Sequence, residues 1–439
     1  KKFNEIFYLK ILDILPFRLT KGQQFALKEI NKDLKSDLRM FRILQGDVGS
    51  GKTIVSLLSI ANVIESNYQC ALMAPTEILA NQHFQLAKKI FKDLNLNIEF
   101  LSGKTEPKKR KKILFSLEKG KIDLLIGTHA LFQKKIVFKK LGYIVIDEQH
   151  KFGVKQRSDL AIKGGKNCDV LLMSATPIPR TMMMSIYGDM DISKIKDKPS
   201  MRKETITLSK PEKKIDELWP YLEKQIRNEN QIFWVCPLIN DSKFLDYSSA
   251  KKKFDIISKK FPNKVGLIHG AMNKDEKETI LKKFLNKEIY ILVSTTVIEV
   301  GIDFPNANII IIENSNKFGL AQLHQLRGRV GRGKNQGICI LLFKESLSQN
   351  AVKRLKILKN SDDGFFIAEE DLKLRGFGDL TGYQQSGLKN FRFADPVIHD
   401  DLFKLAESFI LKIDNINQEK YNFLLKLYDR AEIINIKEV

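Results

Sequence analysis

Two short segments combine glycine, lysine, hydroxyl and carboxylate residues at spacings that could do chemistry. The first, Gly46-Asp47-Val48-Gly49-Ser50-Gly51-Lys52-Thr53, fits the pattern G-x-x-x-x-G-K-[ST], follows the apolar stretch Phe41–Gln45 and opens a helical pattern. Glycines let a backbone wrap closely around phosphates, and the N–H groups of such a loop point at the anion. We expect Lys52 to reach the β- and γ-phosphates of a nucleotide and Thr53 to hold Mg²⁺. The other residues expected to contact the nucleotide here are Gly46, Asp47, Gly49, Ser50 and Gly51.

The second segment, Asp147-Glu148-Gln149-His150, lies at the end of the predicted strand Tyr143–Asp147. Ligands of parallel α/β sheets bind at the carboxyl ends of the strands, so we expect both carboxylates to face the loop that carries Lys52. Asp147 is expected to hold Mg²⁺, directly or through its second coordination sphere. Glu148 is expected to polarise the attacking water as a general base. His150 is weaker evidence for a nucleotide site, because a lone histidine more often has a structural role.

A third candidate, Gln23, precedes the predicted helix Gln24–Leu34. Its amide has a donor and an acceptor and could therefore pair with N6 and N7 of adenine. The alternative is that this segment is only the capped start of a helix, with Thr20 as the cap. Spacing alone favours the cap.

These residues must be positioned by strands and helices. Predicted strands and helices alternate along two successive stretches of the chain, a pattern typical of parallel sheets. The strands predicted in the first stretch are Phe41–Gln45, Cys70–Ala74, Leu124–Gly127, Tyr143–Asp147 and Val170–Ser174. The helices between them include Thr53–Ser66 and Ile78–Leu94. The strands predicted in the second stretch are Gln231–Cys236, Val265–His269, Ile289–Ser294, Ile309–Ile312 and Gly337–Phe343.

The polar segment Asp191–Thr205 between the stretches is predicted to be a linker. After Lys344 the pattern is helical, with a glycine-rich interruption at Leu374–Gly387. A chain of 439 residues is too long for one ordinary core. We therefore predict an α/β protein with domains at residues 1–200 and 201–345 and a helical C-terminal region at 346–439.

The composition of the chain is weaker evidence about its partners and cofactors than these motifs are. The formal charge of +22 favours a polyanionic partner such as nucleic acid, and a generally lysine-rich surface explains it equally well. The run Lys108–Lys112 opens a helix and is interpreted as a solvated face. The 4 cysteines contain no C-x-x-C pair, which disfavours zinc and suggests reduced, packed thiols. No apolar run is long enough for a membrane span, and because the chain starts at Lys1 we expect it to come from a longer protein.

Several segments resemble superfamily 2 helicases, in the order that this family has them. Gly46–Thr53, Asp147–His150 and Ser174-Ala175-Thr176 resemble motifs I to III, while Ser294–Asp303 and Gln325–Arg332 resemble motifs V and VI. A closer resemblance is to RecG, a family of bacterial branched-DNA helicases. The segments that carry it are Asp147–Val154, Ser174–Thr181, His324–Gly333, Asp363–Leu372, Leu374–Gly376 and Gln385–Gly387.

The resemblance implies two tandem RecA-like P-loop domains with ATP and Mg²⁺ bound between them, and a C-terminal translocation motif. Arg329 and Arg332 would contact the γ-phosphate, and Gly301 and Asp303 would line the same cleft. The residues expected to contact DNA or to couple hydrolysis to movement are Thr76, Gln82, Thr128, His129, Ser174, Thr176, His269, Thr295, Arg375 and Gln385. Phe377, Thr381 and Tyr383 depart from the family's usual tail.

The expected function is therefore that of an ATP-dependent DNA helicase or translocase that remodels branched DNA, by fork regression and Holliday junction formation and migration, in repair and recombination. The alternatives are a duplex translocase like the transcription–repair coupling factor Mfd, whose tail motif is shared, and a binding module without hydrolysis, which intact Lys52, Glu148 and Arg332 disfavour. The resemblance also implies a monomeric cytoplasmic motor on branched or duplex DNA and no membrane partner. A wedge domain that precedes the motor in this family would contact single-stranded-DNA-binding protein.

Overall fold

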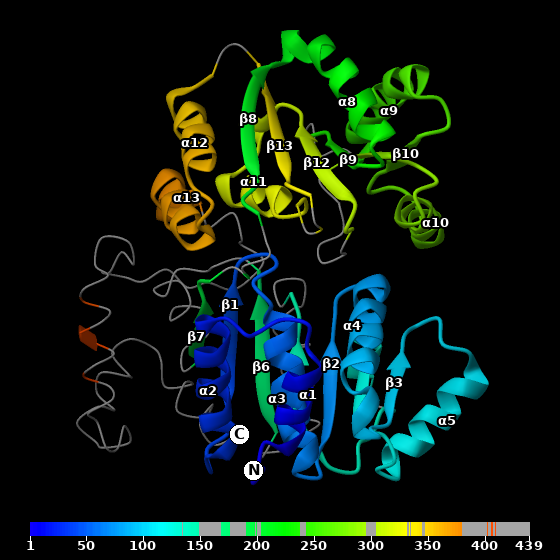
Figure 1. Cartoon of the computed structure of the whole chain (residues 1–439), viewed down its shortest axis with the longest axis vertical. Coiled ribbons are helices and arrows are strands. Elements are labelled where there is room, and N and C mark those ends of the chain that lie inside the picture. Colours follow the sequence, from blue (N-terminus) through cyan, green and yellow to red (C-terminus); the bar gives the residue numbers. More distant parts are fainter. Residues whose placement is uncertain are drawn as a thin grey trace. The chain divides into compact units, whose positions relative to one another are not determined.

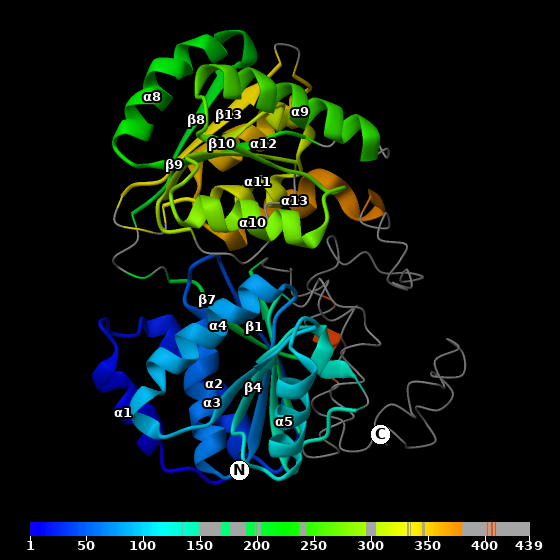
Figure 2. The ribbon, with the colours of Figure 1, turned by 90° about the vertical axis from the view of Figure 1, so that its right-hand side faces the viewer.

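The computed structural model describes residues 1–133, 135–148, 168–175, 190–197, 199, 203–237, 243–295, 304–331, 333, 335–344, 347–379, 402, 405–406 and 409. These residues form two sheets, each flanked by helices (Figures 1 and 2). Every strand pair in both sheets is parallel, which confirms the predicted α/β class. Both sheets belong to one compact unit of residues 1–178 and 190–374. The predicted domain boundaries at residues 200 and 345 stay predictions.

The first sheet has seven strands in the order β3-β4-β2-β5-β6-β1-β7. Its strands are β1 Phe41–Gly46, β2 Gln69–Met73, β3 Ile98–Leu101, β4 Leu124–Gly127, β5 Leu141–Ile146, β6 Asp169–Ser174 and β7 Asp191–Ile195. Because all these strands run the same way, the loops that follow them meet along one edge of the sheet.

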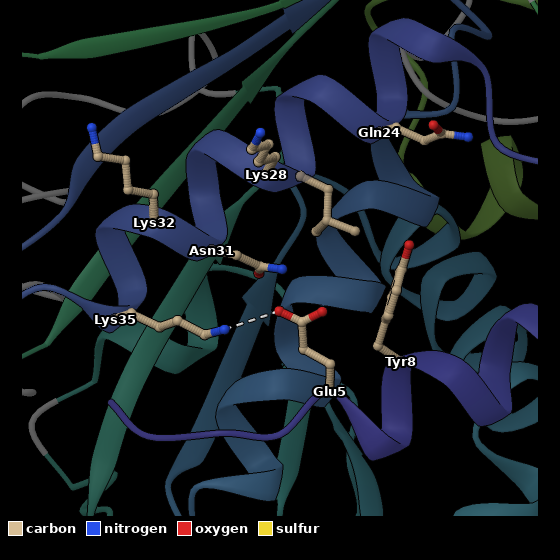
Figure 3. Close-up of a pocket in the computed structure, with 8 residues that line it drawn as sticks. Glu5, Tyr8, Gln24, Lys28, Asn31, Lys32 and Lys35 are labelled. Carbon is tan, nitrogen blue, oxygen red and sulfur yellow. Dashed lines mark hydrogen bonds and ion pairs between the residues drawn. The ribbon is translucent and has the colours of Figure 1, made fainter.

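The helices of this part are α1 Ile6–Ile14, α2 Lys21–Lys35, α3 Lys52–Glu65, α4 Glu77–Ile90 and α5 Pro107–Glu118, with short 3₁₀ turns η1 Lys92–Leu94 and η2 His129–Phe132. Apolar residues of α1 to α4 and alternate strand residues share one core. A hollow of about 310 Å³ lies between α1 and α2, where the Lys35 Nζ is 3.0 Å from a Glu5 carboxylate oxygen (Figure 3). Three exposed lysines of α2 line this hollow, namely Lys28, Lys32 and Lys35.

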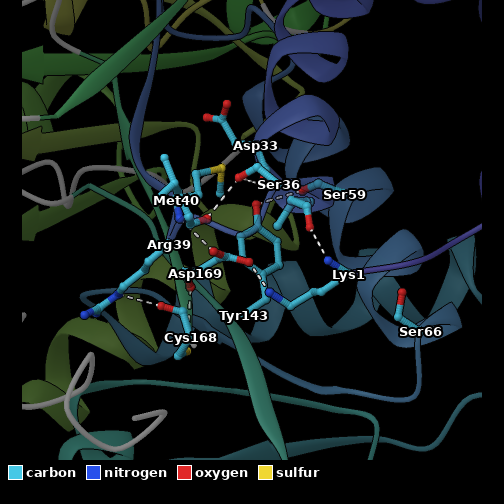
Figure 4. Close-up of polar contacts among 12 residues, drawn as sticks. Lys1, Asp33, Ser36, Arg39, Met40, Ser59, Ser66, Tyr143, Cys168 and Asp169 are labelled. Carbon is cyan, nitrogen blue, oxygen red and sulfur yellow. Dashed lines mark hydrogen bonds and ion pairs between the residues drawn. The ribbon is translucent and has the colours of Figure 1, made fainter. Parts of the chain in front are cut away.

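Polar contacts hold the amino ends of β1 and β6 (Figure 4). The Asp169 carboxylate accepts a hydrogen bond from the Met40 N–H (2.8 Å) and pairs with the Lys1 ammonium, and Arg39 Nε donates to the Cys168 carbonyl (2.8 Å). The Tyr143 hydroxyl meets Ser59 of α3 at 3.0 Å inside the core. These contacts lie at the amino ends of the strands. Parallel sheets bind their ligands at the opposite edge, where the carboxyl ends of the strands lie.

The second sheet has six strands in the order β10-β11-β9-β12-β13-β8. They are β8 Ile206–Pro211, β9 Gln231–Val235, β10 Val265–Ile268, β11 Ile291–Ser294, β12 Ala307–Ile312 and β13 Ile338–Phe343. The surrounding helices are η4 Glu212–Leu218, α8 Trp219–Arg227, α9 Lys243–Lys260, α10 Lys274–Leu285, η5 Ser315–Lys317, α11 Leu320–Arg327, α12 Gln349–Asn360 and α13 Gly364–Asp379.

Alternate residues of this sheet enter two different cores. Phe233, Ile310 and Leu341 pack in the core that includes residues of α10 to α13, whereas Trp234 and Ile311 pack in the core of α8 and α9. Such alternation follows from the period-two geometry of strands, and a sheet covered on both faces requires continuous apolar strands such as Ile309–Ile312.

Two expectations about elements are wrong. The first residues of the predicted linker, Asp191–Ile195, form strand β7, which pairs with β1. This edge strand has exposed residues at Asp191 and Lys194, so its sequence resembles a polar connection. The predicted glycine-rich interruption starts at Leu374, but the backbone stays helical to Asp379 at the end of α13. In the described part of the chain, none of the helices is long and apolar enough to cross a membrane.

Candidate functional site

The loop between β1 and α3 needs glycine at two positions. Gly49 and Gly51 have φ of +77° and +86°, the left-handed region that favours glycine. A Cβ on Gly51 would also lie 2.2 Å from the Gln23 amide nitrogen, so no other residue fits there without displacing Gln23. Helix α3 starts directly after Gly51 with no side-chain cap on its first N–H groups. The amino end of such a helix attracts an anion through its dipole and its N–H groups.

The cation of this loop is Lys52, which is only 9% exposed. Its Nζ donates to the carbonyls of Gly46 (2.7 Å) and Asp47 (3.0 Å), so the ammonium lies over the loop. The Ser50 hydroxyl is buried and has no hydrogen-bond partner among the described residues. A loop with uncapped amides, a buried ammonium and an unsatisfied hydroxyl fits a polyphosphate.

The Asp147 carboxylate lies where β5 ends and is buried. One oxygen accepts from the Glu148 N–H (2.9 Å), and the other lies 2.8 Å from Nε2 of His83 on α4. Burial alone would raise the pKa of Asp147, but the His83 hydrogen bond and the charges of His83 and Lys52 outweigh it and lower this pKa. An ionised carboxylate held in this way fits a divalent cation.

Glu148 adopts φ of 49°, a strained conformation for a residue with a side chain. Burial and the neighbouring Asp147 charge raise the pKa of Glu148, although Lys52, Arg329 and a backbone hydrogen bond from Ala175 act in the opposite direction. The carboxylate is thereby made more basic than an exposed glutamate. A general base needs this property.

Gln23 lies against the same loop, but both ends of its amide are engaged. The oxygen accepts from the Thr20 N–H (3.0 Å), and the nitrogen donates to the Ser50 carbonyl (2.8 Å). The Thr20 hydroxyl in turn accepts from the Gln23 N–H, so the helix cap is confirmed. Pairing of Gln23 with adenine would require these bonds to exchange.

Residues of α11 and of the turn after it extend the site. His324 Nε2 lies 2.8 Å from Asp47 Oδ1, and Arg327 donates to His324 Nδ1 (2.9 Å) and pairs with Asp362 (3.0 Å). Since an arginine can only donate, Nδ1 accepts and the Nε2–H donates to Asp47. Arg329, which is 5% exposed, is near enough for its charge to lower the pKa of Glu148.

The residue-level interpretation missed His83, His324 and Arg327 as site residues. His83 and Asp147 are 64 residues apart, and His324 and Asp47 are 277 apart. No local pattern could have joined them. The only signal was the place of His324 and Arg327 inside the segment His324–Gly333 that resembles RecG.

Most of the predicted DNA-facing residues that the structure describes lie at the carboxyl edges of the two sheets. In the first sheet Thr76 follows β2, Thr128 and His129 follow β4, and Ser174 ends β6. In the second, His269 follows β10 and Thr295 follows the neighbouring β11. The Thr76 hydroxyl caps α4 by accepting from the Leu79 N–H (3.3 Å). Gln82 lies on α4 and is half-buried.

The strand order separates these groups. The P-loop, Asp147 and Ser174 follow β1, β5 and β6, whereas Thr76 and Thr128 follow β2 and β4 on the other half of the sheet. Arg375 belongs to the helical backbone of α13. The predicted site residues that lie outside the described residues are Thr176, Gly301, Asp303, Arg332 and Gln385, together with Gln149 and His150 of the second segment.

Three family models match successive parts of the chain. Residues 20–185 match "DEAD/DEAH box helicase", residues 213–334 match "Helicase conserved C-terminal domain", and residues 361–425 match "ATP-dependent DNA helicase RecG, domain 3, C-terminal". The last model favours RecG over the transcription–repair coupling factor.

Similar proteins agree with this assignment. The chain is 44% identical to the ATP-dependent DNA helicase RecG of Aquifex aeolicus over 98% of its own length and 56% of the relative, and 46% identical to RecG of Thermotoga maritima over 91% and 51%. A solved structure of RecG bound to a three-way DNA junction superimposes with a TM-score of 0.79 at 42% identity, covering 92% of this chain and 52% of that one. The chain thus spans about half the length of these relatives. The chain is therefore of the RecG type over the half of these relatives that it spans.

Proposed function

We propose that this chain is the ATP-driven motor of a helicase that remodels branched DNA. The observation that carries this proposal is the juxtaposition of the Lys52 loop with the buried pair Asp147 and Glu148, in a chain of the RecG type. The proposal covers ATP as the substrate of hydrolysis, and branched or duplex DNA as the track.

Each residue of the ATP site has a role in this proposal. Lys52 moves from the Gly46 and Asp47 carbonyls to the β- and γ-phosphates, and the α3 amides hold the phosphate oxygens. Thr53 and Asp147 would hold Mg²⁺, which supplies positive charge at the phosphates. Glu148 accepts the proton of the attacking water, and its raised pKa improves it as a base.

Arginines complete the site. Arg329, together with Arg332, would stabilise the charge that develops on the transferred phosphoryl group, a contribution of about 10³- to 10⁵-fold in rate for such arginines. Gly301 and Asp303 would line the same cleft. The bond from His324 to Asp47 lies beside the loop and offers a route by which α11 senses what the loop binds.

DNA would be held along the carboxyl edges of the sheets. Hydroxyl and amide side chains such as Thr128 and Gln82 can contact phosphates without reading base sequence, as a translocating motor requires. Thr295 supports this proposal because its buried hydroxyl has no partner among the described residues. Arg375 and Gln385 would link the motor to a duplex-gripping element. A monomeric state, a cytoplasmic location and a contact with single-stranded-DNA-binding protein rest on the resemblance alone.

The test is the rate of ATP hydrolysis with no DNA, with linear duplex and with forked DNA at low salt. We expect DNA to stimulate hydrolysis and Lys52→Ala to abolish it while DNA binding persists. Glu148→Gln should bind ATP and turn it over about 10²- to 10⁴-fold more slowly, because the amide cannot accept the proton. Equal rates with and without DNA would refute a DNA-coupled motor. A Lys52→Ala variant with the wild-type rate would refute the site.

A further inference from the structure

Helix α5 has two chemically different faces. Ile113 and Leu117 are buried and attach the helix to the sheet. Arg110 points the same way, because it donates to the Gln133 side chain (2.5 Å) and contacts the Ser102 carbonyl. On the opposite side, helical periodicity places one stripe of residues, which we name the α5 face: Lys108, Lys111, Lys112, Phe115 and Lys119.

The α5 face has an exposed aromatic ring among its lysines. Phe115 is 60% exposed, and the Lys119 ammonium lies 5.7 Å from the centre of its ring. Because most of the ring is exposed, it contributes little to the packing of the core. An aromatic side chain within a stripe of cations is a common arrangement of surfaces that bind nucleic acid, where the ring contacts a base or sugar and the cations contact phosphates.

The lysines of the α5 face are not neutralised by the fold. In the described part of the chain, Lys108, Lys111 and Lys112 are exposed and form no ion pair, although Glu106 and Glu118 lie at the two ends of the same helix. Nearby Lys104 is different, because its Nζ pairs with Asp275 (2.6 Å) and Glu278 (3.0 Å). The cations of the α5 face are therefore available to an external polyanion.

The position of α5 in the fold shows how the α5 face runs relative to the carboxyl edge of the first sheet. The helix follows β3, the edge strand of the first sheet (Figure 1). Strand β3 is paired with β4. Its first turn therefore starts near the carboxyl edge where Thr128 lies, and the helix then runs back along the side of the sheet. A chain of phosphates held at that edge could continue along α5.

We propose that the α5 face binds the phosphodiester backbone of DNA that flanks the segment held at the carboxyl edge. This inference rests on the proposed function and extends its DNA contacts. From Lys108 to Lys119 the stripe is about 16 Å long, along which one strand of duplex DNA carries about five charges. Lysines act as point charges that suit phosphates in any sequence, and Phe115 contacts a sugar or an unpaired base.

The test compares two double variants of the whole chain, Lys108→Ala/Lys112→Ala and Lys28→Ala/Lys32→Ala. Both remove two exposed lysines that are four residues apart on a helix and have no ion-pair partner among the described residues, and the second pair lines the hollow between α1 and α2 (Figure 3). Alanine preserves helix propensity in both. The measurements are affinity for fluorescent forked DNA across salt concentrations, basal ATPase rate and thermal stability.

We expect the α5 variant to lose affinity on the order of tenfold at low salt and its log–log salt slope to fall by up to about 1.8, from two lost phosphate contacts. The α2 variant should match wild type in both, and neither should change the basal ATPase rate. Phe115→Ala should weaken binding about fivefold without changing the salt slope, since it removes a stacking contact and no charge.

Equal losses in the two double variants would overturn the proposal, because the effect would then come from net charge alone. It would also be overturned if the α5 variant lost binding to polyglutamate while its DNA affinity stayed unchanged, since the face would then suit an acidic protein. Failure of the proposed function is a separate result: wild type itself would show no DNA-stimulated hydrolysis.

Discussion

Buried histidines hold two carboxylates beside the candidate ATP site. His83 contacts Asp147, and His324 contacts Asp47, both at 2.8 Å. Partners of this kind fix the orientation of a metal-binding carboxylate and keep it ionised, which agrees with the lowered pKa of Asp147. In the proposed site His83 is therefore a positioning residue, because it would act through Asp147.

His83→Ala should raise the Mg²⁺ concentration needed for half-maximal ATP hydrolysis by about 10- to 100-fold, since loss of such a partner weakens metal affinity by that factor. The rate at saturating Mg²⁺ should fall less. The matched control is Gln85→Ala, which removes an exposed side chain of the same helix α4. A loss of rate that excess Mg²⁺ cannot restore would show that His83 does not act through the metal.

At the scale of the elements, the central strands of both sheets could be predicted from sequence, whereas among the edge strands only β10 was predicted. Leu124–Gly127 was predicted with the bounds that β4 has, because a strand covered on both faces is apolar throughout. The strands that were missed, β3, β7 and β8, all lie at sheet edges, where exposed and polar residues hide the pattern.

The residues of the candidate site also divide into those that could be predicted from the sequence and those that could not. Residues of the P-loop and the Asp147–Glu148 pair could be singled out because their local order is itself the signal. The partners of these residues could not. The bond from Gln23 to Ser50 depends on how α2 packs against α3, and no spacing in the sequence encodes that packing.

Helix α2 allows a test of this coupling between an element and the site. Thr20→Ala removes the cap of α2 and should cost about 1 kcal/mol of stability. It should also weaken ATP binding, because the same cap orders Gln23 against the loop. Ser348→Ala, which removes the equivalent cap of α12, should cost similar stability and leave ATP binding unchanged. Thermal melts and the KM for ATP distinguish the two, and equal KM values would contradict the coupling.

Across the whole molecule, net charge and the candidate DNA contacts are separate properties. The chain carries +22, yet most of the described candidate residues at the carboxyl edges have uncharged hydroxyl groups. Neutral contacts release no counterions, so the salt dependence of DNA binding reports the lysines and arginines elsewhere on the surface. Affinity and salt dependence should therefore respond to different substitutions.

Thr295→Val tests this division without damage to the fold. Thr295 is 1% exposed and its hydroxyl has no hydrogen-bond partner among the described residues, so a valine of the same shape should keep or slightly raise thermal stability. If that hydroxyl donates to a DNA phosphate, its loss should weaken DNA binding by about 1.5 to 3 kcal/mol, the usual strength of a hydrogen bond to a charged group. The slope of log affinity against log salt should stay that of wild type, because no cation is lost. Unchanged affinity would remove Thr295 from the DNA contacts, and a shallower slope would mean that the substitution displaces cationic residues as well.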